Sequence, residues 1–209
     1  MTADGSWQLG RPGSAIYRLY DAMRGWLSRR LVGYLAEKAL SQAGCRVLEA
    51  GSGPASASSL IARLPQVRLS VAADIDPAAL REARQRDPAL HVVVADLYHL
   101  PFQSNSLHLT WNSSTLEHLD APERALVEMR RVTRQEGHVF VGVPYRYGPL
   151  GWQRWVAKTP VGVWIGMVFD RAELGDRMRA AGLEPIDALC YFFRFFVGVL
   201  AKPARIRTK

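Results

Sequence analysis

The apolar positions of this chain alternate between a helical spacing and short continuous runs. From Ser14 to Leu35 they recur three or four residues apart, which predicts an amphipathic helix that ends by Gly44. Residues 184–201 are strand-like and predict a hairpin centred near Arg194. Between these, the pattern predicts a short buried strand at 46–50 and further strands at 68–74, 91–95, 107–112 and 137–143, separated by helical segments. The pattern predicts an α/β fold with a doubly wound, mostly parallel sheet and a C-terminal antiparallel hairpin.

Three helices in this pattern have acidic start signals. Asp76 is followed by a proline, the combination expected at a helix cap and the first helical position. Asp120 and Glu123, and likewise Asp170 and Glu173, are an acid followed three residues later by a second acid. The sequence therefore predicts N-caps at Asp76, Asp120 and Asp170.

Two segments depart from the strand–helix alternation. Residues 1–44 comprise a polar, Gly/Pro-rich arm and the first helix, which we expect to act as a lid. Residues 45–209 form the predicted core, interrupted at 144–168 by an irregular insertion rich in aromatic and basic residues. Ordinary lid packing is the simplest interpretation of that insertion, and the alternatives are contact with a lipid-like or aromatic acid, a membrane surface or a single-stranded nucleic acid.

Charge and cysteine content narrow the class of protein. The 209 residues carry a formal net charge of +8, which permits an anionic partner but is also typical of a solvated basic face. Cys45 and Cys190 lack metal-ligand spacing and are predicted to be buried thiols, so no metal site is expected. No basic start followed by an apolar run opens the chain. We therefore expect a cytoplasmic protein, with peripheral contact to an anionic membrane left open.

A glycine-rich turn follows the first predicted strand, with the sequence Glu49-Ala-Gly51-Ser-Gly53-Pro-Ala-Ser56. Glycines between a strand and a helix allow a ligand to approach the backbone. Ser56 departs from the third small residue of dinucleotide-binding turns, and the carboxylate of Glu49 would repel a pyrophosphate. That carboxylate suits a ligand carrying a cation, unless Glu49 only caps the turn.

Further acids follow the next two predicted strands. Asp74 ends the second strand about 20 residues past the glycines, where sheets of this type bind ribose hydroxyls. Asp96, with Leu97 beside it, follows the third strand, where it can accept a hydrogen bond from an adenine amino group. Three successive strands that each deliver an acid to one edge favour a binding site there over unrelated surface acids.

The ordered set of these motifs resembles the class I S-adenosylmethionine-dependent methyltransferases, in the small-molecule branch similar to ubiquinone/menaquinone-biosynthesis methyltransferases. The set also includes Ser-Ser-Thr-Leu-Glu-His-Leu at 113–119. The resemblance implies a Rossmann-like fold and S-adenosylmethionine as cofactor. It implies that Glu49, Gly51 and Gly53 hold the methionine end. Its remaining implied cofactor contacts are Asp74 with Ile75 at the ribose, Asp96 and Leu97 at the adenine, Asn112 beside the methyl group, and Tyr20 in the lid helix.

The sequence leaves the catalytic group open. His118 and Tyr145 are the candidates facing the cofactor edge, but His118 equally suits a helix start and Tyr145 suits apolar cover. Methyl transfer from an activated cofactor needs positioning above all, so no obligatory base is expected. The acceptor is predicted to be small, with hydrophobic or lipid-like molecules as candidates, and nucleic acid is disfavoured. The oligomeric state and the atom methylated stay undetermined.

Two alternatives to a methyltransferase remain at this stage. A nucleotide-dependent oxidoreductase shares the expected topology, although Glu49 and Ser56 disfavour it. A non-catalytic member of the fold that binds a membrane or a partner is suggested by the basic residues at both ends of the chain.

Overall fold

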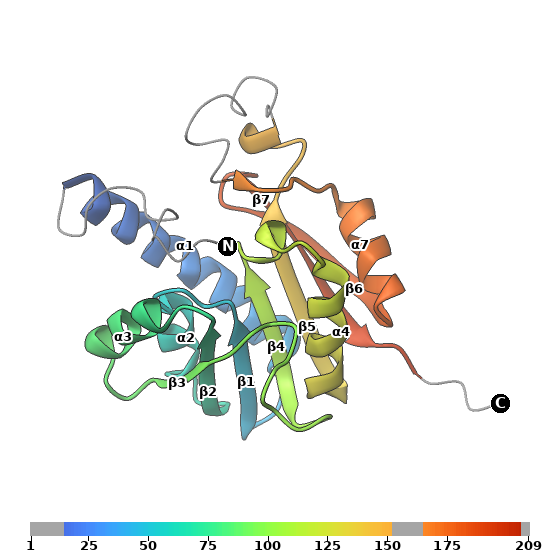
Figure 1. Cartoon of the computed structure of the whole chain (residues 1–209), viewed down its shortest axis with the longest axis horizontal. Helices are drawn as coiled ribbons and strands as arrows, with labels where there is room; N and C mark the ends of the chain where they lie inside the picture. Colours follow the sequence, from blue (N-terminus) through green and yellow to red (C-terminus); the bar gives the residue numbers. More distant parts are fainter. Residues whose placement is uncertain (1–14, 152–164, 206–209) are drawn as a thin grey trace.

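The structure is a computed structural model that describes residues 15–151 and 165–205; for residues 15–24, 26, 27 and 150 it describes the backbone alone. Within these ranges a seven-stranded sheet has the order β3-β2-β1-β4-β5-β7-β6 (Figure 1). Its strands are β1 (Cys45–Ala50), β2 (Val67–Asp74), β3 (His91–Val94), β4 (Leu107–Ser113), β5 (Thr133–Pro144), β6 (Leu183–Tyr191) and β7 (Phe196–Pro203). Strands β1 to β5 pair in parallel, whereas β7 is antiparallel to both β5 and β6. The predicted fold class is confirmed.

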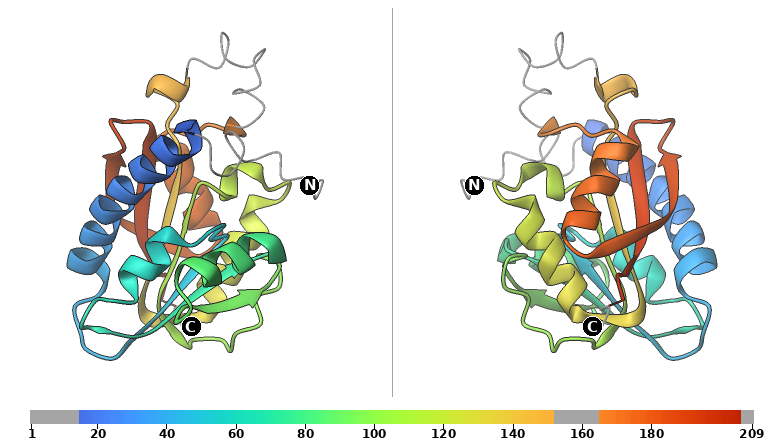
Figure 2. Two further views of the ribbon diagram at one scale, coloured as in Figure 1. Left: turned by 90° about the vertical axis from the view of Figure 1, so that its left-hand side faces the viewer. Right: turned by 90° about the vertical axis from the view of Figure 1, so that its right-hand side faces the viewer.

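Helices cover both faces of the sheet. Adjacent residues of a strand point to opposite faces, so an apolar strand exposes apolar side chains on both faces, and each face is buried by helices. Leu48 belongs to the buried cluster shared with α4 and α7, whereas its neighbour Val47 belongs to the cluster shared with α1 and α2 (Figure 2). The helices are α1 (Ala15–Ala39), α2 (Ser56–Ile61), α3 (Pro77–Arg86), α4 (Pro122–Val132) and α7 (Arg171–Ala180), with short 3₁₀ turns η1 (Leu116–His118) and η2 (Pro149–Gly151). The described side chains of α1 from Leu31 onward thus pack on the sheet as part of the core.

Two of the three predicted helix caps are confirmed. The side chain of Asp76 accepts a hydrogen bond from Ala78 N (2.8 Å), and that of Asp170 accepts one from Glu173 N (2.9 Å). The predicted cap at Asp120 is wrong, since the N-cap of α4 is Ala121 and its side chain makes no capping bond. Pro122 occupies the first helical position, where its fixed φ and missing N–H are favourable, and this places Asp120 one residue too early.

Strand β5 begins four residues earlier than the sequence predicts, at Thr133 instead of residue 137. The Thr133 hydroxyl donates to the Met129 carbonyl oxygen (2.6 Å) and lies 2.7 Å from the Thr110 hydroxyl of β4. This joins the end of α4 directly to the sheet. Gly137 lies inside the strand, at a point where the backbone of β5 comes close to that of β4. A Cβ at this position would lie 2.8 Å from the His108 carbonyl oxygen.

The two cysteines differ in their surroundings. Cys45 is buried, as predicted, whereas Cys190 is exposed and the prediction for it was wrong. Cys190 lies on β6, the edge strand of the sheet, where alternate side chains face solvent. In residues 15–151 and 165–205 no cluster of His, Cys, Asp or Glu side chains has the make-up of a metal site. None of the helices in those ranges has the length and apolarity needed to cross a membrane.

Candidate active site

The glycine turn after β1 lies at the carboxyl edge of the sheet and takes a left-handed backbone. Gly51 has φ +79° and Gly53 φ +51°, and Gly51 N donates to the Ala73 carbonyl oxygen of β2 (2.8 Å). Ala55 also has a positive φ, +53°, at the position where the resembled family commonly has glycine. The N–H groups of Gly51 and Ser52 are thus bonded to β2, which holds the turn at this edge with a conformational cost at Ala55.

The two glycines differ in what surrounds them. A Cβ at Gly51 would lie 2.5 Å from Cγ2 of Thr115, whose hydroxyl donates to the Gly51 carbonyl oxygen (2.8 Å). A Cβ at Gly53 would meet no atom within 4 Å. Gly51 is thus required by the protein's own packing, whereas Gly53 borders open space that a ligand can enter.

The carboxylates of Asp74 and Glu49 accept hydrogen bonds that hold this turn and the start of α2 in place. The two carboxylate oxygens of Asp74 accept hydrogen bonds from Gly53 N (2.7 Å) and Asp76 N (2.9 Å). Glu49 is buried, and its Oε2 accepts from Ser58 Oγ (2.5 Å) and Ser58 N (3.1 Å) at the start of α2. The half-buried Asp74 carboxylate retains lone pairs for a ligand hydroxyl, while Glu49 also holds α2 in place.

Beyond Asp74 the edge offers an apolar surface and another acid. Ile75 is 54% exposed, which is high for a large apolar side chain next to a buried strand. Asp96 is half-buried, accepts a hydrogen bond from Tyr98 N (2.9 Å), and lies 3.4 Å from His99 Nδ1. Leu97 is buried in the core. Ile75 is therefore the apolar group most available to a planar ring, more so than Leu97.

Asn112 has a structural role that the sequence did not indicate. The side chain is fully buried; its amide nitrogen donates to the Ala50 carbonyl oxygen and its amide oxygen accepts from Leu116 N. Asn112 thereby fastens the η1 turn to the end of β1, and its contact with a cofactor stays a prediction. Tyr20 lies in α1, but its side chain is outside the described residues, as are Trp152, Trp155 and Trp164 of the insertion.

Glu117 is the site residue that sequence reasoning missed. It is 3% exposed, and its Oε2 has no hydrogen-bond partner in the described part of the chain. Burial raises the pKa of its carboxyl group to about 8. The only sequence signal was an acid between leucines in Leu-Glu-His-Leu, directly after a buried strand. A perturbed acid at the cofactor edge is a candidate functional group.

The two catalytic candidates lie on the same side of the sheet edge as Glu117. His118 Nε2 is 4.0 Å from Glu117 Oε1, and burial lowers the pKa of His118. The strap at 165–169 passes over this turn, because Met167 N donates to the Glu117 carbonyl oxygen (3.0 Å). Tyr145 follows β5; its ring packs against that of Tyr147, with centroids 5.8 Å apart. An ion pair of His118 with Glu117 forms only if the imidazole is protonated, so the neutral ring keeps a nitrogen for an acceptor.

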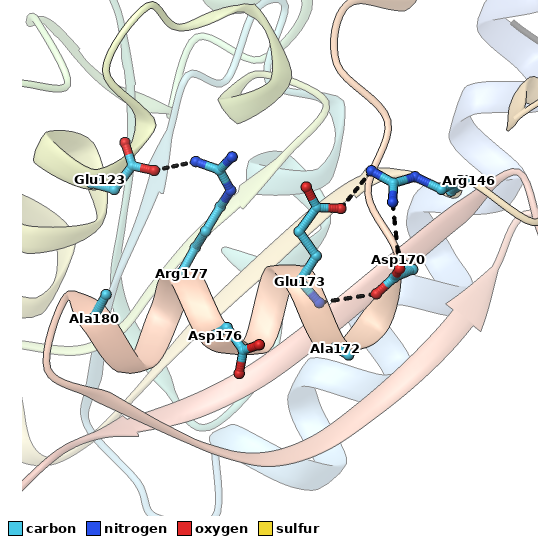
Figure 3. A pocket seen from close by; sticks show the side chains of 8 residues that line it. All are labelled: Glu123, Arg146, Asp170, Ala172, Glu173, Asp176, Arg177 and Ala180. Carbon is cyan, nitrogen blue, oxygen red and sulfur yellow. Dashed lines mark hydrogen bonds and ion pairs between the residues drawn. The ribbon is translucent and has the colours of Figure 1, made fainter.

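A separate, open pocket of about 510 Å³ lies along α7, between this helix, Glu123 of α4 and the segment after β5 (Figure 3). Its charged groups are paired with one another: Arg146 contacts both Asp170 and Glu173, and Arg177 contacts Glu123 of α4. These pairs tie the segment after β5 and α4 to α7. None of the predicted cofactor residues lines this pocket, so we assign it a structural role.

Known proteins resemble this chain in the region that carries the edge motifs. Residues 48–141 match the family model described as a methyltransferase domain. A malonyl-[acyl-carrier protein] O-methyltransferase of Laribacter hongkongensis is 37% identical over 112 residues, 47% of this chain and 37% of that protein. A probable S-adenosylmethionine-dependent methyltransferase of Mycolicibacterium smegmatis is 30% identical over 171 residues, 80% of this chain and 62% of that protein. The chain thus spans only part of the length of these relatives.

Solved structures share the fold at low sequence identity. The putative methyltransferase of Haloferax volcanii, solved with the Trm112 activator, superposes with a TM-score of 0.73 at 16% identity, covering 87% of this chain and 91% of that one. Geranyl diphosphate C-methyltransferase of Streptomyces coelicolor superposes with a TM-score of 0.69 at 18% identity, covering 94% and 88%. The family match and the sequence relatives show that the chain carries a class I S-adenosylmethionine-dependent methyltransferase domain over residues 48–141, and the solved structures show that it has the same fold.

Proposed function

We propose that this protein is an enzyme that transfers the methyl group of S-adenosylmethionine to a small acceptor with an apolar body. The observation that carries the proposal is the left-handed glycine turn, open at Gly53 and bordered by the Asp74 carboxylate. This turn presents an open backbone surface and an acid to one ligand, which suits a zwitterionic amino acid linked to a nucleoside and disfavours a pyrophosphate.

The proposed contacts follow the order along the cofactor that the sequence predicts, except that Ile75 takes the place of Leu97 on the adenine. In our proposal the Gly51–Gly53 backbone and Glu49 hold the methionine end, and Asp74 accepts hydrogen bonds from the ribose hydroxyls. Ile75 packs on the adenine, and Asp96 accepts from its amino group. Leu97 supports this surface from the core, and Asn112 positions η1 beside the methyl group.

The cofactor supplies a methyl group that is already activated, so the protein's part is to orient the acceptor and exclude water. His118 suits a proton acceptor, because its lowered pKa keeps the imidazole neutral at pH 7. Tyr145 and the half-buried hydroxyl pair of Ser113 and Tyr191, 2.7 Å apart, provide further polar contacts at the same edge. The acceptor then lies over the ends of β4, β5 and β6.

Replacement of Asp74 by Asn tests the cofactor site. We expect affinity for S-adenosylhomocysteine to fall by about tenfold to a hundredfold, since charged hydrogen bonds to ribose hydroxyls are lost. Asp76→Asn is the matched control: Asn caps helices as well as Asp, so binding should be unchanged. Titration calorimetry measures both, with thermal unfolding to show that each variant is folded. Equal affinity in the Asp74 variant, or no binding by the folded wild type, contradicts the proposal.

We also propose that the protein makes peripheral contact with anionic membranes through the turn between β6 and β7. This turn and the segment after β5 lie at the same end of the sheet (Figure 1), and Tyr145 N donates to the Phe195 carbonyl oxygen (2.8 Å). Phe193 is 73% exposed and Tyr147 68%, with the exposed Arg194 beside them. Aromatic side chains flanked by a cation suit an anionic lipid surface.

The contact is tested with vesicles of mixed phosphatidylglycerol and phosphatidylcholine. We expect sedimentation with these vesicles at low salt, and about a tenfold or greater loss in the double variant Phe193→Ser, Tyr147→Ser. Val127→Ser, which removes a half-exposed apolar side chain on α4, should leave binding unchanged. Absence of wild-type binding, or equal loss in the Val127 variant, argues against this surface.

A further inference from the structure

Glu117 is a buried acid whose charged form lacks a partner. Oε2 makes no hydrogen bond within the described residues, and the side chain is almost wholly removed from solvent. An ionised carboxylate in such a setting is strongly disfavoured unless a cation lies beside it. A protein that only needed to fill this volume would be more stable with an apolar residue there.

The groups that face Glu117 do not provide this cation at neutral pH. His118, on the same turn, has its pKa lowered by burial. Tyr191 of β6 stays neutral, because burial raises the pKa of its hydroxyl group, which is hydrogen-bonded to Ser113 of β4. From the strap that covers the turn, Met167 contributes only its backbone N–H, which binds the Glu117 carbonyl oxygen. The missing partner must therefore come from outside the described protein groups.

The turn that carries Glu117 is fixed to the cofactor edge. The Thr115 side chain packs on the backbone of Gly51 and donates to its carbonyl oxygen, and Asn112 ties the same turn to Ala50. Glu117 therefore stands two residues from a direct contact with the glycine turn. Tyr191 of β6, whose hydroxyl group lies 2.7 Å from Ser113 Oγ of β4, is close enough for the charge of Glu117 to add to burial in raising its pKa. The acid therefore lies near both the cofactor turn and the polar pair assigned to the acceptor surface.

We propose that Glu117 is the counter-ion for the sulfonium group of bound S-adenosylmethionine. Without a cation it keeps its proton; when the sulfonium binds, it releases the proton to solvent, and it takes a proton back once the methyl group has left. The inference rests on the proposed function. Since the sulfur of S-adenosylhomocysteine is uncharged, Glu117 distinguishes the methyl donor from the spent product by charge alone and favours product release.

Because binding of the cofactor is coupled to proton release from Glu117, the direction in which affinity changes with pH can be predicted. Binding of the cation lowers the pKa of Glu117 from its value of about 8 in the free protein. At pH 7 the free acid is mostly protonated, so binding releases close to one proton. Affinity for S-adenosylmethionine then rises with pH, by up to about tenfold per unit, and levels off above pH 8. Affinity for S-adenosylhomocysteine lacks this rise.

Calorimetry at pH 7 in two buffers of different protonation enthalpy measures the protons released. The wild-type protein is titrated with S-adenosylmethionine and with S-adenosylhomocysteine, a comparison that needs no variant. Glu117→Gln and Glu117→Met are titrated alongside, because the amino group of each ligand also titrates near neutral pH and the variants provide its baseline. We expect close to one additional proton released by the wild type with S-adenosylmethionine only, and none by either variant.

Equal proton release by the wild type and the variants with S-adenosylmethionine would overturn the inference while leaving the proposed function intact. Equal wild-type release with both ligands, after subtraction of the variant baseline, would do the same. Failure of both ligands to bind folded wild-type protein contradicts the proposed function itself, and the inference with it.

Discussion

Replacement of Glu117 by Gln should stabilise the protein at alkaline pH and destabilise it at acid pH. The folded-state pKa of Glu117, about 8, lies above the ordinary value of 4.5 for an unfolded glutamate. The folded state therefore binds this proton more tightly, and wild-type stability is lost as pH rises from about 4.5 to 8. The loss is about 1.4 kcal/mol per pH unit, on the order of 5 kcal/mol in all.

The Gln variant does not have this dependence, but its buried amide group lacks acceptors at a cost of about 1–3 kcal/mol. We therefore expect the variant to be the less stable protein at pH 5 and the more stable one at pH 8.5. The difference in melting temperature should change by about 10–20 °C over that range. Thermal unfolding of both proteins at half-unit pH intervals measures this, with Glu184→Gln as an exposed control. Parallel pH profiles for wild type and variant would show that Glu117 is not a buried, protonated acid.

The parts of the fold that the sequence predicts are those that local patterns determine. Strands β1 to β4, the caps at Asp76 and Asp170, and the terminal hairpin depend on residues close in the chain; strands β1 to β4 lie within about one residue of their predicted bounds, and both caps and the hairpin are confirmed. Errors arise where a competing local or long-range effect decides. Pro122 moves the start of α4 past Asp120, and the edge position of β6 exposes Cys190.

The residues of the candidate site also divide into those that local sequence predicts and those that it does not. Acids at the ends of strands, such as Asp74 and Asp96, follow from strand boundaries and parallel order, so the sequence locates them. The state of Glu117 depends on the strap near Met167, some 50 residues away, which covers the turn and excludes water from it. No periodicity around Glu117 reveals that cover, and an acid after a buried strand is by itself an ordinary surface residue. Asn112 was missed as a structural link for the same reason, since its partner Ala50 is on another strand.

Alanine replacements at three glycines should distinguish a glycine that protein packing requires from one that ligand binding requires. Gly44, Gly51 and Gly53 all have positive φ, so each replacement costs about 1–2 kcal/mol in backbone strain. At Gly51 the new methyl group also collides with the Thr115 side chain, which adds about 1–3 kcal/mol. Gly51→Ala is therefore expected to be the least stable of the three by thermal or denaturant unfolding.

Gly53→Ala and Gly44→Ala form the informative pair, because in both a Cβ meets no protein atom within 4 Å and φ is left-handed. Their losses of stability should be alike. Gly44 precedes the amino end of β1, however, whereas Gly53 borders the proposed cofactor space at the carboxyl end. We expect Gly53→Ala to weaken binding of S-adenosylhomocysteine by at least about tenfold, since a displaced or clashing contact of this kind costs upward of 1.4 kcal/mol. Gly44→Ala should bind as the wild type does. Equal affinity in the two variants would mean that the space beside Gly53 is not where the cofactor lies, and would move the site away from the glycine turn.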